Sequence, residues 1–192
     1  NNEEIINDLD LLYNNIYNLK KNKYNLIYIN NIFLNIILPE TDKFKYLCAS
    51  NLKKITKQDL ILYSIILENC PNSVLFFIEE SYDQKEYILK IMSNVVNRIY
   101  FIPHISRNIH IYRLLYFDII LDTISYNLKS SIYDILLLNI PIVTLEGDTV
   151  YSRLTYSVLK NLNLDELITK STEKYINLAI NLYNNQEFLL KI

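Results

Sequence analysis

Glycine is almost absent from this chain of 192 residues: Gly147 is the only one, beside four prolines and no tryptophan. Glycine enters the left-handed backbone region without steric cost, so turns in this chain must rely on Asn and Asp instead. The single glycine precedes a predicted helix, in a turn that is expected to need a positive φ. The sequence contains no glycine-rich phosphate loop of the GxGxxG or P-loop type, and neither HExxH nor GxSxG occurs.

Cysteine and net charge are low as well. Two cysteines, Cys48 and Cys70, exclude a disulfide-stapled scaffold and indicate reduced thiols in a core. With 19 basic and 21 acidic residues the net charge is -2, so neither a nucleic acid nor an anionic membrane is an expected partner. The longest apolar run, 27–38, is interrupted by three asparagines and is not expected to span a membrane. No secretory signal is recognisable, and we expect a cytoplasmic fragment of a longer protein.

Hydrophobic residues, by contrast, make up 51% of the chain, which is enough for a sizeable core. After a predicted amphipathic helix at 3–21 and a mixed stretch at 24–38, strand and helix patterns alternate. The predicted strands are 44–49, 74–78, 99–102, 117–121, 141–145 and 166–168. The predicted helices between and after them are 56–69, 83–96, 107–116, 130–139, 149–161 and 171–184.

This alternation at short spacing predicts an α/β fold, with a Rossmann-like parallel sheet covered by helices on both faces. Residues 43–192 form the predicted sheet domain, and residues 1–42 a separate N-terminal segment. Several predicted strands are continuous apolar runs, which is typical of strands buried on both faces. Ligands of such sheets bind beyond the carboxyl ends of the strands.

Polar residues cluster just after several predicted strands. Ser130 and Ser131 open a predicted helix, where backbone N–H groups and the helix dipole favour an anion such as a phosphate. Lys129 beside them opposes the dipole unless an anion is bound there. Lys54 follows the first strand and could reach a phosphate as a point charge, although a solvated loop lysine is the ordinary alternative.

The segment after the third strand carries His104, Arg107, His110 and Arg113. His110 and Arg113 are three residues apart and share a helix face, so they could line a nucleotide pocket or simply lie on a surface helix. Two histidines without a cysteine or acidic ligand pattern are weak evidence for zinc, and no metal site is predicted. Asp134, one turn into its helix, could accept a hydrogen bond from a sugar hydroxyl or complement the helix dipole.

The order of these pieces resembles the carboxyl-terminal half of the catalytic region of the O-linked N-acetylglucosamine transferase family, which includes the plant SPINDLY type. Residues 121–168 read LDTISYNLKSSIYDILLLNIPIVTLEGDTVYSRLTYSVLKNLNLDELI. The family pattern is roughly LDTxPYNGHTTxxDALWxGxPVVTxxGxTxxSRVxxSLLxxLGLxELI, in register without a gap. Residues 50–77 and 104–123 are similar to two upstream family stretches. Residues 26–38 resemble the tail of the preceding half of the catalytic region, so the resemblance covers about residues 26–192.

The resemblance implies a glycosyltransferase of the GT-B type that moves N-acetylglucosamine from UDP-N-acetylglucosamine to a Ser or Thr hydroxyl of a protein, with inversion. Lys54 would neutralise the departing diphosphate as the catalytic residue, so no cofactor or metal is expected. The other implied donor-binding residues are Asn51 near the UDP, Arg107, His110 and Arg113 around uracil and ribose, Lys129, Ser130 and Ser131 at the phosphates, and Asp134 on the ribose. The protein acceptor would be recruited through regions that precede this chain.

The chain departs from the family pattern at the phosphate loop. Leu128 replaces a glycine and Lys129 a histidine, so the backbone could approach the phosphates less closely. SPINDLY-type members use GDP-fucose, so a GDP-fucose donor is an alternative. A degenerate, non-catalytic interaction module is a second alternative, and an N-linked transferase or an epimerase is a third, against which the Ser152–Arg153 pair and the unbroken motif argue.

Overall fold

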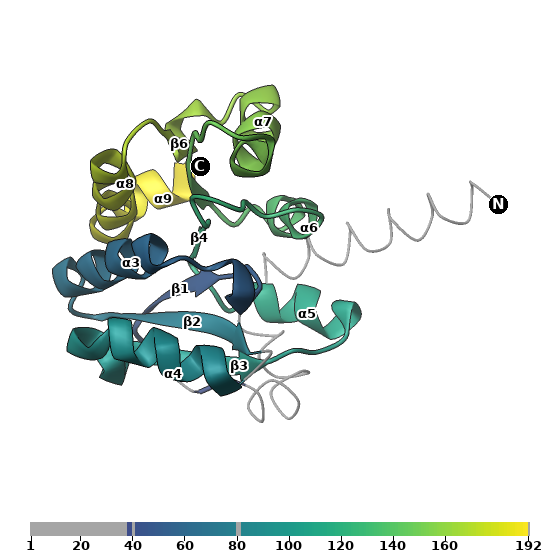
Figure 1. Ribbon diagram of the computed structural model, residues 1–192. Helices are drawn as coiled ribbons and strands as arrows, with labels where there is room; N and C mark the ends of the chain where they lie inside the picture. The colour runs from purple at the N-terminus through teal and green to yellow at the C-terminus, as the bar shows by residue number, and fades with distance from the viewer. Residues whose placement is uncertain (1–37, 40, 80–81, 192) are drawn as a thin grey trace. The chain divides into compact units, whose positions relative to one another are not determined.

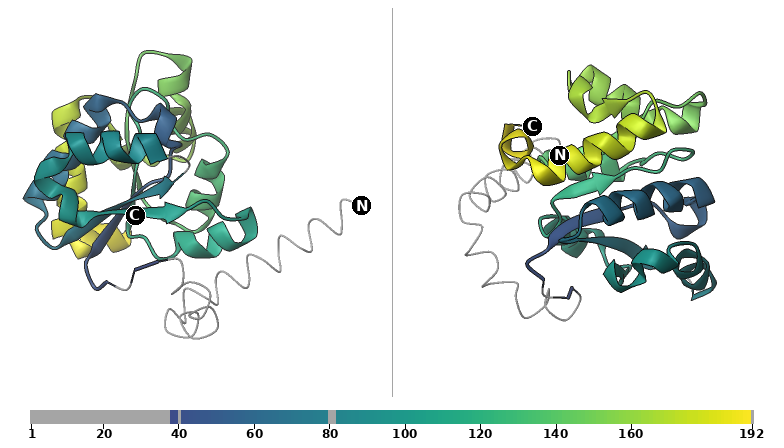
Figure 2. Two further views of the ribbon diagram at one scale, coloured as in Figure 1. Left: turned by 60° about the horizontal axis from the view of Figure 1, so that its bottom comes forward. Right: turned by 90° about the vertical axis from the view of Figure 1, so that its left-hand side faces the viewer.

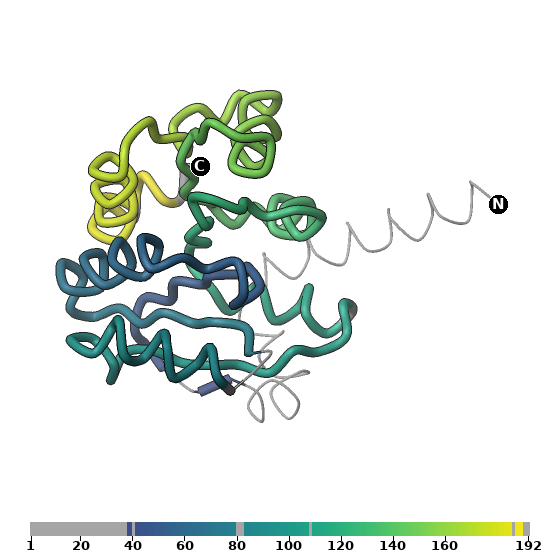
Figure 3. Tube along the Cα trace, viewed as in Figure 1, coloured from purple at the N-terminus to yellow at the C-terminus, as the bar shows by residue number. Residues whose placement is uncertain are grey.

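The computed structural model describes residues 38–39, 41–79 and 82–191 (Figures 1 and 3). The chain divides into two units, Asn1–Thr41 and Asp42–Ile192. The predicted helix 3–21 and almost all of the predicted mixed segment 24–38 lie outside the described residues. The assignment of residues 1–42 to a separate segment therefore stays a prediction. The second unit contains the sheet and all predicted site residues.

Six strands form one parallel sheet in the order β3-β2-β1-β4-β5-β6. The strands are β1 (Phe44–Cys48), β2 (Ser73–Glu79), β3 (Ile99–Pro103), β4 (Ile119–Leu121), β5 (Ile142–Leu145) and β6 (Ile168–Thr169). This is the order of the doubly wound nucleotide-binding folds, in which ligands bind where the order reverses. Here the reversal lies between β1 and β4, which are paired at Tyr46 with Ile119. The predicted fold class is confirmed.

Helices cover both faces of the sheet, as predicted (Figures 1 and 2). Helices α3, α4 and α8 lie on one face, and α5 and α6 on the other (Figure 2). The helices of this unit are α3 (Lys57–Asn69), α4 (Tyr82–Ile91), α5 (Arg107–Leu114), α6 (Ser131–Leu137), α7 (Leu154–Asn161), α8 (Thr172–Asn184) and α9 (Gln186–Lys191). Double coverage explains why β1 and β2 are nearly uniform apolar runs.

Three predicted elements differ in detail from the observed ones. The predicted helix 83–96 ends at Ile91 and continues as the 3₁₀ segment η2 (Ser93–Arg98), which has a non-helical residue at Val95. The predicted helix 149–161 is η3 (Val150–Ser152) followed by α7, because Thr149 and Ser152 form a capping box that closes a separate turn. The predicted strand 166–168 is instead η4 (Asp165–Leu167) leading into β6.

The chain uses asparagine where most proteins use glycine. Among the described residues, positive φ occurs at Asn139 (49°) and Asn163 (57°), which follow α6 and α7. The expectation that Asn replaces Gly in turns is thus confirmed, whereas the predicted positive φ of Gly147 is wrong. A Cβ atom at Gly147 would lie 2.2 Å from the Ser152 Oγ atom and 2.9 Å from the Ser152 carbonyl oxygen. The glycine is required by the close approach of the 3₁₀ turn and not by its own backbone conformation.

Candidate active site

The loops after β1 and β4 lie at the point where the strand order reverses, and a buried hydrogen bond joins them. The Ser50 Oγ and Thr123 Oγ1 atoms are 2.9 Å apart, and both side chains are buried. Thr123 also donates to the Tyr126 carbonyl oxygen at 2.5 Å. Because a hydroxyl has one proton to donate, Ser50 must be the donor to Thr123.

Lys54 ends the short 3₁₀ segment η1 (Leu52–Lys54) in the first of these loops. The Asn51 Oδ1 atom accepts from the Lys53 backbone N–H at 2.8 Å and so caps this segment. The side chain of Lys54 is half-buried, and it forms no ion pair or hydrogen bond within the described part of the chain. Among the described residues the Lys54 ammonium group therefore has no counter-charge, whereas the Asn51 side-chain oxygen already accepts a hydrogen bond within the loop.

Helix α3 begins directly after Lys54 with a capping box. Thr56 caps the helix, and the Asp59 carboxylate accepts from the Thr56 backbone N–H at 2.7 Å. The other carboxylate oxygen of Asp59 accepts at 2.8 Å from the backbone N–H of Ile124, a residue of the loop after β4. Burial raises the pKa of the Asp59 carboxyl above its usual value. Asp59 therefore stabilises two segments at once, the start of α3 and the start of the second loop.

The loop after β4 is anchored from within by Asp122. Its carboxylate accepts from the Leu128 backbone N–H and from the Thr144 hydroxyl on β5, both at 2.9 Å. The side chain is 1% exposed, and burial raises the pKa of the carboxyl from 3.8 to about 6. The main-chain carbonyl of Asp122 accepts from the buried Tyr175 hydroxyl at 2.8 Å. These bonds fix the loop shortly before the predicted phosphate-binding residues.

Leu128, which replaces the family glycine, has a buried side chain and an ordinary negative φ. The backbone at this position thus does not need a glycine. Lys129 and Ser130, which follow, are exposed. Ser130 occupies the N-cap position of α6 but makes no side-chain capping hydrogen bond. Among the described residues, neither the Ser130 hydroxyl nor the Lys129 ammonium group has a hydrogen-bond or ion-pair partner.

Two of the predicted nucleotide-binding residues are paired with each other. Arg107 on α5 donates to both carboxylate oxygens of Asp134 on α6, from Nη2 at 2.7 Å and from Nε at 3.2 Å. The Arg107 side chain is 74% exposed and the Asp134 side chain is 12% exposed. Hydrogen bonding to Asp134 raises the pKa of the Arg107 guanidinium. The sequence did not predict this pair, because the two residues are on different helices.

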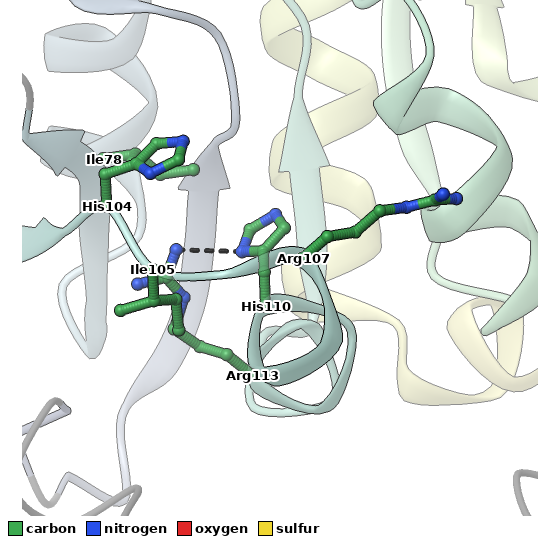
Figure 4. A pocket seen from close by; sticks show the side chains of 6 residues that line it. All are labelled: Ile78, His104, Ile105, Arg107, His110 and Arg113. Atoms are coloured by element: carbon green, nitrogen blue, oxygen red, sulfur yellow. Dashed lines mark hydrogen bonds between the residues drawn. The ribbon is translucent and has the colours of Figure 1, made fainter.

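Arg113 and His110 line a pocket of about 140 Å³ beside the carboxyl end of β3, with Ile78, His104, Ile105 and Arg107 (Figure 4). Arg113 is buried and donates to the Pro103 carbonyl oxygen at 2.6 Å and to the His110 Nδ1 atom at 2.8 Å. Its buried Nε atom has no hydrogen-bond partner among the residues that the structure describes. Arg107, in contrast, extends away from His110 and Arg113 (Figure 4).

The protonation states of this pair follow from the geometry. Burial, and then the charge of Arg113, lower the pKa of His110 from 6.5 to about 4. Burial also lowers the pKa of Arg113 to about 10, which leaves it a cation at neutral pH. A neutral His110 that accepts at Nδ1 carries its hydrogen on Nε2. The pocket is therefore lined by a neutral imidazole ring and by a buried cation.

The structure brings the predicted site residues together in two groups. In the first group, the Ser50–Thr123 hydrogen bond joins the segment of Asn51 and Lys54 to the loop that leads to Lys129, Ser130 and Ser131. In the second group, the Arg107–Asp134 ion pair joins α5 to α6. Sequence reasoning missed Ser50, Asp59, Asp122 and Thr123. The available signal was the Asp-Thr pair at the end of an otherwise apolar strand. Within the described ranges, no three His, Cys, Asp or Glu side chains are grouped as metal ligands, and no helix is long and apolar enough to cross a membrane.

Two solved structures that share this fold carry the names of glycosyltransferases. An O-GlcNAc transferase mutant from Thermobaculum terrenum superposes with a TM-score of 0.74 at 24% identity, covering 81% of this chain and 31% of that one. WaaG, a glycosyltransferase of lipopolysaccharide biosynthesis, gives a TM-score of 0.61 at 12% identity over 88% of this chain and 44% of WaaG. The sheet order and these likenesses define the class of fold: a Rossmann-like domain of the kind found in GT-B glycosyltransferases.

Residues 35–192 match the model of glycosyl transferase family 41, and the chain belongs to this family. A UDP-N-acetylglucosamine–peptide N-acetylglucosaminyltransferase from Caenorhabditis elegans is 30% identical over 155 residues, which is 79% of this chain. The chain spans 13% of the length of that relative. The predicted resemblance to the O-linked N-acetylglucosamine transferase family is thereby confirmed.

Proposed function

We propose that residues 42–191 are the donor-nucleotide domain of a protein O-glycosyltransferase, which moves N-acetylglucosamine from UDP-N-acetylglucosamine to a Ser or Thr hydroxyl with inversion. Family membership and the C. elegans relative support the reaction class. One observation carries the proposal: two lysines without an ion pair among the described residues, and a serine without a capping bond, lie on two loops that are bonded together where the strand order reverses. Such a place favours an anionic ligand.

In this proposal the diphosphate of the donor lies at the start of α6. The Ser130 and Ser131 hydroxyls donate to its oxygens, and Lys129 and Lys54 supply positive charge. The uracil base of the donor lies in the pocket beside His110 and Arg113.

The reaction then depends on stabilising the leaving group. The acceptor oxygen bonds to the anomeric carbon while the bond from that carbon to the diphosphate oxygen breaks. Negative charge accumulates on the departing UDP, and the fixed donors and cations stabilise it in the transition state. Lys54 is the residue that we assign to this role. The proton of the acceptor hydroxyl passes to a base that the family resemblance places in the other half of the catalytic region.

Nucleotide titration tests the proposal. UDP, added to the chain in a calorimeter, should bind saturably. Lys54→Ala should lower the affinity for UDP by about tenfold, as expected for the loss of one charge-assisted contact. Lys53→Ala is the matched control, because Lys53 is exposed on the same 3₁₀ segment and should not contribute.

Two other results would point elsewhere. A clear preference for GDP over UDP would favour the SPINDLY-type donor. Absence of binding by either nucleotide at millimolar concentration, in a chain with a cooperative unfolding transition, would refute the donor site and favour an interaction module.

A further inference from the structure

The segment that carries Lys54 is fixed at both of its ends to the same neighbouring loop. At one end Ser50 donates to the hydroxyl of Thr123 at 2.9 Å. At the other end the Asp59 carboxylate, which also holds Thr56, accepts from the Ile124 backbone N–H at 2.8 Å. Residues 51–55 thus bridge two anchor points that are adjacent in the partner loop.

The partner loop is itself held on the far side of these anchors. The Thr123 hydroxyl donates to the Tyr126 carbonyl oxygen at 2.5 Å, and the Asn127 side chain donates to the Thr123 carbonyl oxygen at 2.8 Å. The Leu128 N–H is held by Asp122. The hydrogen-bonded path from Thr123 therefore ends two residues before Ser130.

We propose that Thr123 is a positioning residue, which together with Ser50 and Asp59 sets the place of Lys54 relative to Ser130 and Ser131. This inference rests on the proposed donor site and deepens it. Thr123 does not touch the diphosphate. Its hydroxyl is the point through which the lysine-bearing segment and the serine-bearing loop are held together, since it accepts from the first and donates within the second. Both hydroxyls are buried, so water does not replace the bond.

The geometry predicts different effects for two substitutions of Thr123. Thr123→Val keeps the shape of the side chain but leaves the Ser50 hydroxyl and the Tyr126 carbonyl oxygen without this partner. Thr123→Ser keeps the hydroxyl and should restore both bonds. Ser50→Ala is a milder variant, which removes only the bond between the loops. Ser73→Ala is the matched control, because Ser73 is equally buried and donates to the Cys70 carbonyl oxygen at 2.7 Å, at the amino end of β2.

The test is a double-mutant cycle on UDP affinity, measured by calorimetry with the full 192-residue chain. Thr123→Val and Ser50→Ala should each lower the affinity for UDP by about fivefold, the factor expected from one neutral hydrogen bond. Thr123→Ser and Ser73→Ala should bind as the unsubstituted chain does. In a Lys54→Ala background the effect of Ser50→Ala should largely disappear, because the bond acts by placing that lysine.

Each outcome is decisive. Suppose that Lys54→Ala lowers the affinity for UDP, and that Ser50→Ala lowers it by the same factor with and without Lys54. The positioning role is then wrong, while the donor site stands. If Ser50→Ala leaves UDP affinity unchanged, the positioning role is also wrong. If the unsubstituted chain binds no nucleotide, the proposed function itself fails, and this inference with it. Should Thr123→Val not fold, the Ser50→Ala arm alone decides the question.

Discussion

The buried carboxyl of Asp122 makes the stability of this domain depend on pH in a direction opposite to that of an ordinary surface carboxylate. Its pKa is raised from 3.8 to about 6 by burial, so the folded state binds its proton more tightly than the unfolded state does. The stabilisation is fully present below about pH 4 and is lost as the pH rises through about 6. The difference between the two pKa values corresponds to about 3 kcal/mol.

Asp122→Asn removes this titration and keeps the shape of the side chain. The amide oxygen can still accept from the Leu128 N–H, which the carboxylate accepts at 2.9 Å. Relative to the unsubstituted chain, the variant should therefore gain about 2.5 kcal/mol in free energy of unfolding between pH 4 and pH 7.5, whatever its absolute stability. The comparison cancels the titration of groups that both chains share.

Urea denaturation at several pH values measures this difference, with near-ultraviolet circular dichroism of the buried Tyr46, Tyr63 and Tyr175 as the signal. Asp148→Asn, the same chemical change at an exposed position, is the control. A difference between Asp122→Asn and the unsubstituted chain that stays constant from pH 4 to 7.5 would refute the reasoning. A difference that changes in the opposite direction would mean that the hydrogen bonds from Leu128 and Thr144 outweigh burial.

Two further predictions follow from single residues. Gly147→Ala should lower the free energy of unfolding by about 1–3 kcal/mol, because its Cβ atom would overlap Ser152 and the 3₁₀ turn must move; equal urea midpoints would contradict this account. The His110 ring should show no titration above about pH 5 in proton NMR, since burial and Arg113 lower its pKa to about 4. UDP affinity should accordingly not change with the protonation of this ring between pH 6 and 8. An inflection of the assigned His110 resonances near pH 6.5 would contradict the burial of the ring beside Arg113.

Much of the fold was predictable because it follows from local patterns. Continuous apolar runs predicted the buried parallel strands, and Thr56 and Ser171 marked the starts of α3 and α8, as observed. The predicted helices failed at 83–96 and 149–161, where 3₁₀ turns compete with the α-helix through local hydrogen bonds that hydrophobic periodicity does not show.

The candidate site was predictable only in part. The sequence placed Lys54 and Ser130 after strands, so it predicted that both lie at the carboxyl edge of the sheet. It gave no sign of the Arg107–Asp134 pair or of the Ser50–Thr123 bond, whose partners are 27 and 73 residues apart. Such pairs depend on which strands become neighbours, and several strand orders satisfy the same alternation of strand and helix.

The sequence by itself determined the class of fold, the family and the kinds of side chain at the edge of the sheet, because periodicity and motif spacing are local properties of the chain. Only the tertiary structure decided that β1 and β4 are adjacent, that Gly147 is required by Ser152, and that the Lys54 segment is bonded to the loop after β4. The physical reason is that these features come from contacts between segments distant in sequence, whose geometry is fixed when the sheet packs and its polar groups are buried with their partners.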